Sequence, residues 1–339
     1  MNFYRVFLRG LFLVILMGTV ETLHATHLRA GEITLTRVSC TSREFRVTIT
    51  VYTNTGSSIR FGGGTLTFGD GTADFITPTI ENTLRPDLGP NIGMVVFTMT
   101  HVFPAAGSYI VSYLEVNRNA GILNMFDSVD TPFFIQTTID IDPFVGCDNS
   151  PRLLVPPIDE ACTGAAWTHN PGAYDPDGDS LSFEMTIPKQ DRDRFVGAYR
   201  PPNTKEFYAG LDYGTANEAQ DGPPTFNINS VTGTIIWDAP GAAGVYNIAF
   251  LIKEWRKIGG VWIQLGYVTR DMQIIVNDCK NRRPELKVPA DICVEAGTVI
   301  NEKIFGTDPD FDSVKIEAFS RSEERRVGKE CRSRWSPYH

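Results

Sequence analysis

Apolar and polar residues alternate along several short stretches of this chain, a pattern typical of half-buried β-strands. Residues 43–52 and 109–116 alternate in this way and are rich in β-branched and aromatic residues. Residues 132–141 continue the pattern and would close a sheet. The first part of the chain, residues 27–142, is therefore predicted to be an all-β unit.

A second group of strands is predicted further along the chain. Residues 226–240 read as two strands around a Thr-Gly turn, with Trp237 as a large core residue. An alternating strand begins at residue 244, and residues 261–265 and 272–276 are predicted as two closing strands. We therefore expect a second all-β unit over residues 147–278.

The same Gly-x-Tyr start occurs in both predicted units, at residues 107–109 and 244–246. In β-sandwiches, a tyrosine at such a corner ties its strand to the preceding loop through its hydroxyl group. We expect Tyr109 and Tyr246 to play this role.

The N-terminus has the features of a signal peptide. Arg5 and Arg9 precede a short apolar run at residues 11–17, and Ala25 offers a cleavage site. An uncleaved anchor is the alternative, but the run is short for a membrane span. No later segment is apolar enough to cross a bilayer, so the chain is predicted to be secreted or displayed at the cell surface.

Residues 321–339 are basic and show no periodicity. This run resembles, over its whole length, the in-frame translation of a DNA-sequencing adapter, and we interpret it as artefactual. The alternative is a basic tail that binds an anionic surface. Without residues 1–25 and 321–339, 23 basic and 36 acidic residues remain, a net charge of −13. Nucleic acid is then a poor partner, because nothing would offset the repulsion of its phosphates.

The candidate chemistry is concentrated in the run D-P-D-G-D. Its carboxylates, Asp175, Asp177 and Asp179, are close enough to repel one another unless a cation lies among them. Ca²⁺ accepts carboxylate and carbonyl oxygens in a flexible geometry, so calcium is the predicted cofactor. The alternative is a plain polar turn. The run is not an EF-hand, because Ser180 and Thr186 stand where that loop needs Gly and a carboxylate.

The Asp-rich turn occurs twice. Its second copy reads D-P-D-F-D and begins at Asp308, 133 residues after Asp175, which is about the size of one sandwich domain. A Cys-x-Asn sequence and a second cysteine precede each turn. Asp308, Asp310 and Asp312 are therefore further candidate metal ligands, and residues 279–320 are the expected start of a second, truncated repeat.

The cysteines occupy matching positions in this repeat. Their spacing favours local disulfides, Cys147–Cys162 and Cys279–Cys293, formed in an oxidising compartment. Cys40 is then left without a partner in this prediction. Zinc is excluded, since no C-x-x-C sequence or histidine cluster accompanies these cysteines.

Two families share these motifs. In residues 27–142, the order F-G-D-G, H-x-F and G-x-Y-x-V resembles a PKD-like domain, although Leu66 replaces the usual aromatic residue. The resemblance implies an immunoglobulin-like β-sandwich that spaces or presents other parts of a protein and has no catalytic residue. Together with the resemblance of residues 147–278 described next, it implies tandem immunoglobulin-like β-sandwich domains. Asp70 is expected to form a turn, and His101 to be structural.

Residues 147–278 resemble the cadherin-like repeats of exported surface proteins of gliding bacteria. The motifs are D-P-D-G-D-x-L-x-F, then T-G-x-I-x-W, then G-x-Y-x-I-x-F. That family holds Ca²⁺ with the Asp-rich turn, a strand-end carboxylate and the interdomain linker. The resemblance therefore adds Glu254, Asn277 and Asp278 to the candidate ligands.

No catalytic motif is present. H-E-x-x-H and G-x-S-x-G are both missing from the sequence, so we predict that the chain is not an enzyme. The predicted function is adhesion or surface structure, stiffened by calcium, with surface proteins or glycans as partners and an outer-membrane location.

Two alternatives remain. One is the carbohydrate-binding or accessory region of a secreted hydrolase, with Tyr199, Tyr208 and Tyr213 as exposed aromatic residues. The other is a structural spacer that binds no metal, whose Asp-rich turns only keep sheet edges soluble.

Overall fold

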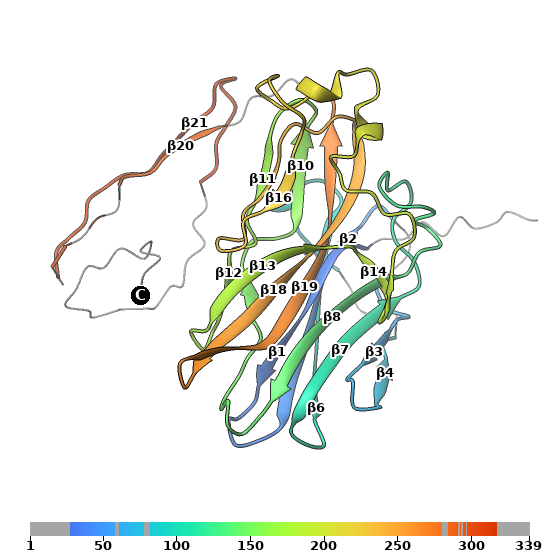
Figure 1. The fold of residues 1–339 in the computed structure, drawn as a ribbon, viewed down its shortest axis with the longest axis vertical. Helices are drawn as coiled ribbons and strands as arrows, with labels where there is room; N and C mark the ends of the chain where they lie inside the picture. The colour runs from blue at the N-terminus through green and yellow to red at the C-terminus, as the bar shows by residue number, and fades with distance from the viewer. Residues whose placement is uncertain are drawn as a thin grey trace, which may run out of the picture.

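The computed structural model describes residues 28–57, 61–77, 82–279, 284–290, 292, 294–295 and 297–316. Within these residues the chain forms β-strands and three short 3-10 turns, with no α-helix (Figure 1). The predicted all-β fold is confirmed. No helix in the described part of the chain is long and apolar enough to cross a membrane. The predicted signal peptide and the 321–339 tail lie outside the described residues.

The strands before residue 142 are β1 (Leu28–Arg37), β2 (Glu44–Asn54), β3 (Thr65–Thr67), β4 (Ala73–Phe75), β5 (Thr83–Leu84), β6 (Ile92–Val102), β7 (Gly107–Glu115) and β8 (Phe133–Ile141), with the 3-10 turn η1 (Pro86–Leu88). They include the predicted strands at 43–52, 109–116 and 132–141.

The later elements are β9 (Arg152–Leu153), β10 (Ile158–Cys162), β11 (Trp167–His169), β12 (Ala173–Tyr174), β13 (Ser180–Thr186), β14 (Lys189–Asp191), β15 (Arg194–Phe195), η2 (Lys205–Tyr208), η3 (Tyr213–Thr215), β16 (Phe226–Ile228), β17 (Ile235–Trp237), β18 (Gly244–Ile258), β19 (Val261–Asn277), β20 (Glu285–Lys287) and β21 (Phe305–Thr307).

One large sheet contains strands from both predicted units. Its main path runs β4-β3-β7-β8-β19-β1-β2-β6-β5. β19 lies between β8 and β1, pairing Val268 with Thr137 and Met272 with Ala30. β18 and β19 form the long hairpin that crosses the centre of Figure 1. The proposed boundary after residue 142 therefore does not interrupt the hydrogen-bonded sheet.

Two hydrophobic cores underlie this sheet. The first is built from residues between Leu28 and Ile141. The second is built mainly from residues after 152 and is centred on fully buried Trp237, as the sequence predicts. Trp237 Nε1 donates to the Tyr208 hydroxyl at 3.0 Å, so the indole is both packed and hydrogen-bonded.

Both predicted tyrosine corners are confirmed. The Tyr109 hydroxyl donates to the carbonyl of Ala105 at 2.9 Å, and the Tyr246 hydroxyl donates to that of Ala242, also at 2.9 Å. Each tyrosine thus fixes the loop four residues before it, once in each core.

The two strands predicted at 261–265 and 272–276 are one continuous strand, β19. Arg270 and Asp271 are charged, so in the sequence they look like part of a loop between two strands. In the structure both are buried within β19. Arg270 pairs with Glu32 at 2.8 Å, and Asp271 pairs with Arg118 at 2.8 Å. Both partners come from the first part of the chain, so ion pairing as well as backbone pairing joins the two cores.

The predicted disulfide pairing is wrong. The bonds are Cys40–Cys147 and Cys162–Cys279, and Cys293 lies outside the described residues. Cys147 meets Cys40 because its segment runs beside β1, where Ser150 N–H donates to the carbonyl of Leu35. Cys162 meets Cys279 because β10 runs parallel to the end of β19. Long-range strand pairing therefore decides the connectivity.

The described part of residues 284–316 contains one strand pair, β20 with β21. The alternating residues Val314 and Ile316, whose pattern predicts a strand, are not in a strand.

Candidate metal centre

The first Asp-rich turn connects β12 to β13. The carboxylate of buried Asp175 accepts the backbone N–H groups of Asp177 at 2.8 Å and Asp179 at 3.1 Å. Gly178 has a φ of 87°, a left-handed conformation that suits glycine. The turn thus uses Asp175 as its hydrogen-bonded pivot. The carboxylate of Asp177 is exposed and accepts from Asn149, whereas that of Asp179 is largely buried.

Strand pairing brings Glu254 to this turn. β13 begins directly after Asp179, and its Leu181 is the antiparallel partner of Glu254 in β18. The Glu254 side chain is buried. The sequence prediction that Glu254 joins Asp175, Asp177 and Asp179 is thus consistent with the geometry of the turn.

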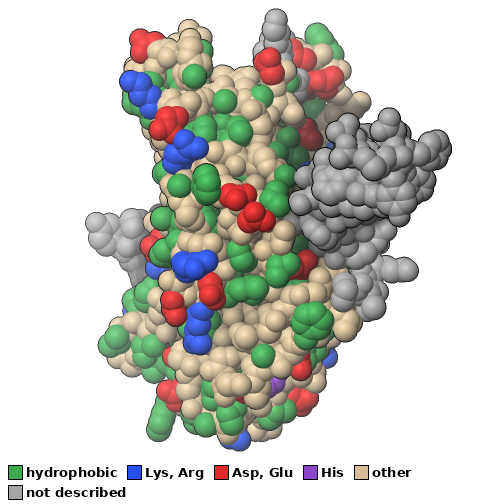
Figure 2. Space-filling model, turned by 90° about the vertical axis from the view of Figure 1, so that its right-hand side faces the viewer, with side chains coloured by type: hydrophobic (Ala, Val, Ile, Leu, Met, Phe, Trp, Pro, Cys, Tyr) green, Lys and Arg blue, Asp and Glu red, His purple; other side chains and the backbone are tan. Residues whose placement is uncertain are grey.

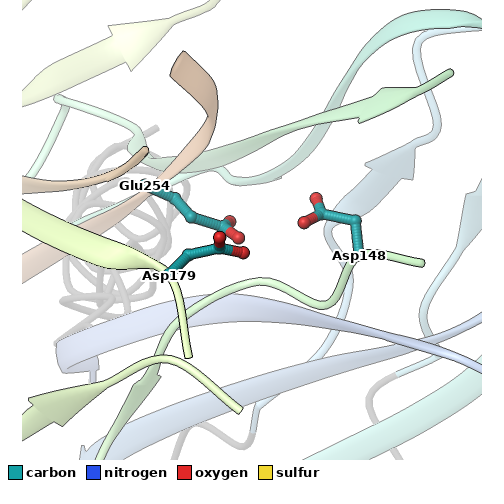
Figure 3. A group of neighbouring side chains, drawn as sticks. All are labelled: Asp148, Asp179 and Glu254. Carbon is teal, nitrogen blue, oxygen red and sulfur yellow. The ribbon is translucent and has the colours of Figure 1, made fainter. Parts of the chain in front are cut away.

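A third segment contributes Asp148, which follows the Cys40–Cys147 disulfide. Asn149 Oδ1 accepts the N–H of Arg37 at 2.8 Å, which fixes this segment against β1. The side chains of Glu254 and Asp179 lie side by side, and that of Asp148 faces them from the opposite side (Figure 3). Their nearest ligand oxygens lie within 4.8 Å of one another, and the same holds for Asp175, Asp177 and Asp179. We call these five acidic residues the acidic cluster.

Arg256 supplies one positive charge to the acidic cluster. Its guanidinium pairs with Asp179 and, at 3.0 Å, with Asp148. It also donates to the carbonyls of Val145 at 2.8 Å and Cys147 at 3.0 Å. The hydrogen bond to Asp179, opposed by burial, raises the pKa of Arg256, so the guanidinium remains charged.

The carboxyl groups resist ionisation in this setting. Burial, followed by the charges of Asp148 and Asp175, raises the pKa of Glu254. Burial also raises the pKa of Asp148, although the Glu254 hydrogen bond and the charge of Arg256 oppose that shift. Without another cation, the acidic cluster must therefore hold protons or carry strong repulsion.

The arrangement fits a calcium ion. Ca²⁺ binds oxygens at about 2.3–2.6 Å, so ligands on opposite sides of the ion lie about 5 Å apart. Within each group the ligand oxygens lie within 4.8 Å of one another, close enough for one ion to contact all three. Asp148 Oδ2 and Glu254 Oε1 are buried and accept no hydrogen bond from a described donor group. A hydrogen bond between these two carboxyl groups needs a proton on one of them, whereas a bound cation would neutralise the negative charge of both.

Two predicted ligands lie elsewhere. Asn277 is the last residue of β19 and Asp278 follows it. At this end of the strand Gly244 pairs with Val276, ten positions along β18 from Glu254. At about 3.3 Å per residue this is roughly 33 Å. Asn277 donates to Glu160 at 3.1 Å, and Asp278 accepts from Thr163 at 3.4 Å. These residues therefore do not join the acidic cluster.

The second Asp-rich turn has the same local form as the first. Asp308 accepts the N–H groups of Asp310 at 2.7 Å and Asp312 at 3.3 Å, and Phe311, with a φ of 67°, replaces Gly178. Among the described residues, the groups of three or more neighbouring acidic, His or Cys side chains do not include this turn. The sequence repeat thus reproduces the turn without an acidic cluster around it.

Sequence reasoning missed Asp148 and Arg256. Asp148 stands within Cys147-Asp-Asn149, and its place next to the Asp-rich turn in the Cys-x-Asn repeat is the sequence feature that points to it, although the second copy has Lys280 there. Arg256 gave no such signal, because its role depends on the register between β13 and β18.

Comparison with known proteins adds no assignment: no protein-family model and no curated protein matches this chain.

Proposed function

We propose that this chain is a non-enzymatic, exported cell-surface protein in which calcium bound at the acidic cluster stiffens the fold. The convergence of buried carboxylates from three separate segments supports this proposal most directly. A cation at the acidic cluster would link the segment of Asp148, the Asp-rich turn and β18. It would thereby brace the point where the chain passes from the first core to the second.

Two further observations support an exported adhesive or structural role. Both disulfides join residues more than 100 positions apart, and such bonds persist in oxidising compartments. The face shown in Figure 2 carries charges of both signs, scattered rather than gathered into a basic patch. With the acidic composition, this favours protein or glycan partners over nucleic acid.

Arg256 favours a second candidate, a spacer that needs no metal. Its guanidinium already contacts two carboxylates of the acidic cluster, and protonation of Glu254 would relieve more of the repulsion. In that case the acidic cluster is a structural hydrogen-bonded network and calcium adds nothing.

Thermal melts of the full chain in EDTA and across Ca²⁺ concentrations separate these candidates. A ligand that binds only the folded state at about 100 times its Kd stabilises by about 2.7 kcal/mol. We expect a calcium-dependent rise in Tm that Glu254→Gln abolishes. Glu184→Gln, on the exposed side of β13, is the matched control and should retain the rise. A melt that does not respond to Ca²⁺ would rule out the calcium proposal and support the spacer.

A further inference from the structure

A cleft of about 470 Å³ lies on the side of the molecule away from the acidic cluster's turn. Its floor is the outer face of β3, β7 and β8, opposite the first hydrophobic core. The β3–β4 turn borders the cleft, and so does the β14–β15 turn, which contributes Asp191 and Arg192. β3 and β4 lie at the right of Figure 1, on the side that faces the viewer in Figure 2. The volume is within the usual range for small-ligand sites, about 300–1,000 Å³.

Strand register arranges the floor in two rows that run across the strands. One row is polar and lies on β3 and β7, where Thr67 pairs with Ser112. The next residue in register, Gln136 of β8, is buried and does not line the cleft. The hydroxyls of Thr67 and Ser112 are 2.7 Å apart. With strands about 4.8 Å apart, the floor from β3 across β7 to β8 extends about 10 Å, enough to follow a short extended ligand.

The neighbouring row is largely apolar. Thr65 pairs with Leu114, which pairs with Phe134. A ligand lying across the strands would therefore meet the hydroxyl groups of Thr67 and Ser112 along one edge and the carbon atoms of Leu114 and Phe134 along the other. Sugar rings present both kinds of surface, since their hydroxyls project around a ring of C–H groups.

The β14–β15 turn adds one group of each charge. The side chain of Arg192 makes no hydrogen bond or ion pair with any described residue, although its backbone N–H donates to Asp191 at 2.7 Å. Asp191 can accept from ligand hydroxyls, and the planar guanidinium of Arg192 can donate several hydrogen bonds. Because the two charges cancel, the cleft offers polar contacts without selecting a charged ligand.

We propose that this cleft binds a short neutral oligosaccharide laid across β3, β7 and β8, with Asp191 and Arg192 contacting its hydroxyl groups. The site differs from the one expected from Tyr199, Tyr208 and Tyr213. Tyr208 is buried and Tyr213 donates to the carbonyl of Asn203, so these two tyrosines pack within the second core's loops. Tyr199 packs against a separate small apolar cluster that includes Ile122 and Val196. The proposal does not depend on calcium, because the cleft contains no residue of the acidic cluster.

Titration calorimetry of the full chain against cello-, xylo-, manno- and laminarihexaose tests the proposal. We expect at least one sugar to bind, and Arg192→Ala and Thr67→Val each to weaken that binding about tenfold. Arg194→Ala, on exposed β15 outside the cleft, is the matched control and should bind normally. Binding should persist in EDTA below the metal-free Tm, which separates this result from the calcium proposal.

Three outcomes would overturn the proposal. These are no binding of any neutral hexaose, binding unchanged in both cleft variants, and preferential binding of an acidic oligogalacturonate. Thr67→Val keeps the shape of the side chain, and near-native melting curves would show that a loss of binding does not reflect unfolding.

Discussion

The guanidinium of Arg256 donates from Nε to both carboxylate oxygens of Asp179, at 2.8 and 3.1 Å. The acidic cluster therefore contains a fixed positive charge beside the position we propose for calcium. This charge lowers the repulsion in the metal-free protein, and it also opposes the binding of a second cation. Stability without calcium and affinity for calcium are thus coupled through one side chain.

We predict that Arg256→Gln lowers stability in EDTA by roughly 2–4 kcal/mol, because it leaves largely buried carboxylates without their counter-charge. The stabilisation gained from Ca²⁺ should become larger than in the wild type, since the competing charge is gone. Chemical denaturation with and without Ca²⁺ measures both effects. Arg194→Gln, an exposed residue of β15, is the control. An equal loss of stability in EDTA and in Ca²⁺ would contradict the coupling.

Local features of this site could be predicted from sequence, whereas its assembly could not. The turn around Asp175 and the tyrosine corner at Tyr109 form within a few residues, so short motifs identify them. Asp148 reaches the cluster only because a distant segment runs along β1. The disulfide prediction is wrong for the same reason. It pairs Cys147 with the nearby Cys162, whereas long-range strand pairing places Cys147 next to Cys40. The sequence predicts two strands where β19 is one, because charged residues such as Arg270 and Asp271 are typical of loops. Their burial depends on ion pairs with distant residues, which the sequence does not reveal.

The disulfide connectivity makes a direct prediction. Peptide mapping without reduction should recover Cys40 linked to Cys147 and Cys162 linked to Cys279. The bonds close loops of 107 and 117 residues, for which the chain-entropy model gives about 4–5 kcal/mol each. Replacing Cys162 and Cys279 together by Ser should lower the stability by about that amount. Recovery of a Cys147–Cys162 peptide would contradict the structure.

Glu115 predicts a pH dependence outside the acidic cluster. Burial raises the pKa of this carboxyl to about 7, although hydrogen bonds from Tyr113 and Gly62 oppose the shift. Since the folded state holds the proton more tightly than the unfolded state, this residue favours folding most below about pH 4.5. That contribution declines as the pH rises toward 7 and is lost above it.

Subtracting the stability of Glu115→Gln from that of the wild type isolates this effect. At about 1.4 kcal/mol per pKa unit, the difference should change by about 3 kcal/mol between pH 4.5 and pH 8, with the wild type relatively less stable at pH 8. Urea melts at each pH, in EDTA, measure it. A difference that does not change with pH would show that Glu115 ionises normally in the folded protein.

The ion pair of Asp271 with Arg118 should be essential to the junction between the two cores. Both side chains are buried, and Arg118 also donates to the carbonyls of Pro132 at 3.1 Å and Lys189 at 2.9 Å. Asp271→Ala leaves the guanidinium without its counter-charge, so we expect a loss of about 3–5 kcal/mol. The double variant Arg118→Met, Asp271→Leu should be more stable than Asp271→Ala, because it removes both charges and fills the space. Chemical denaturation compares these variants with Asp74→Ala, an exposed β4 control. If Asp271→Ala behaves like that control, β19 does not depend on this ion pair to join the cores.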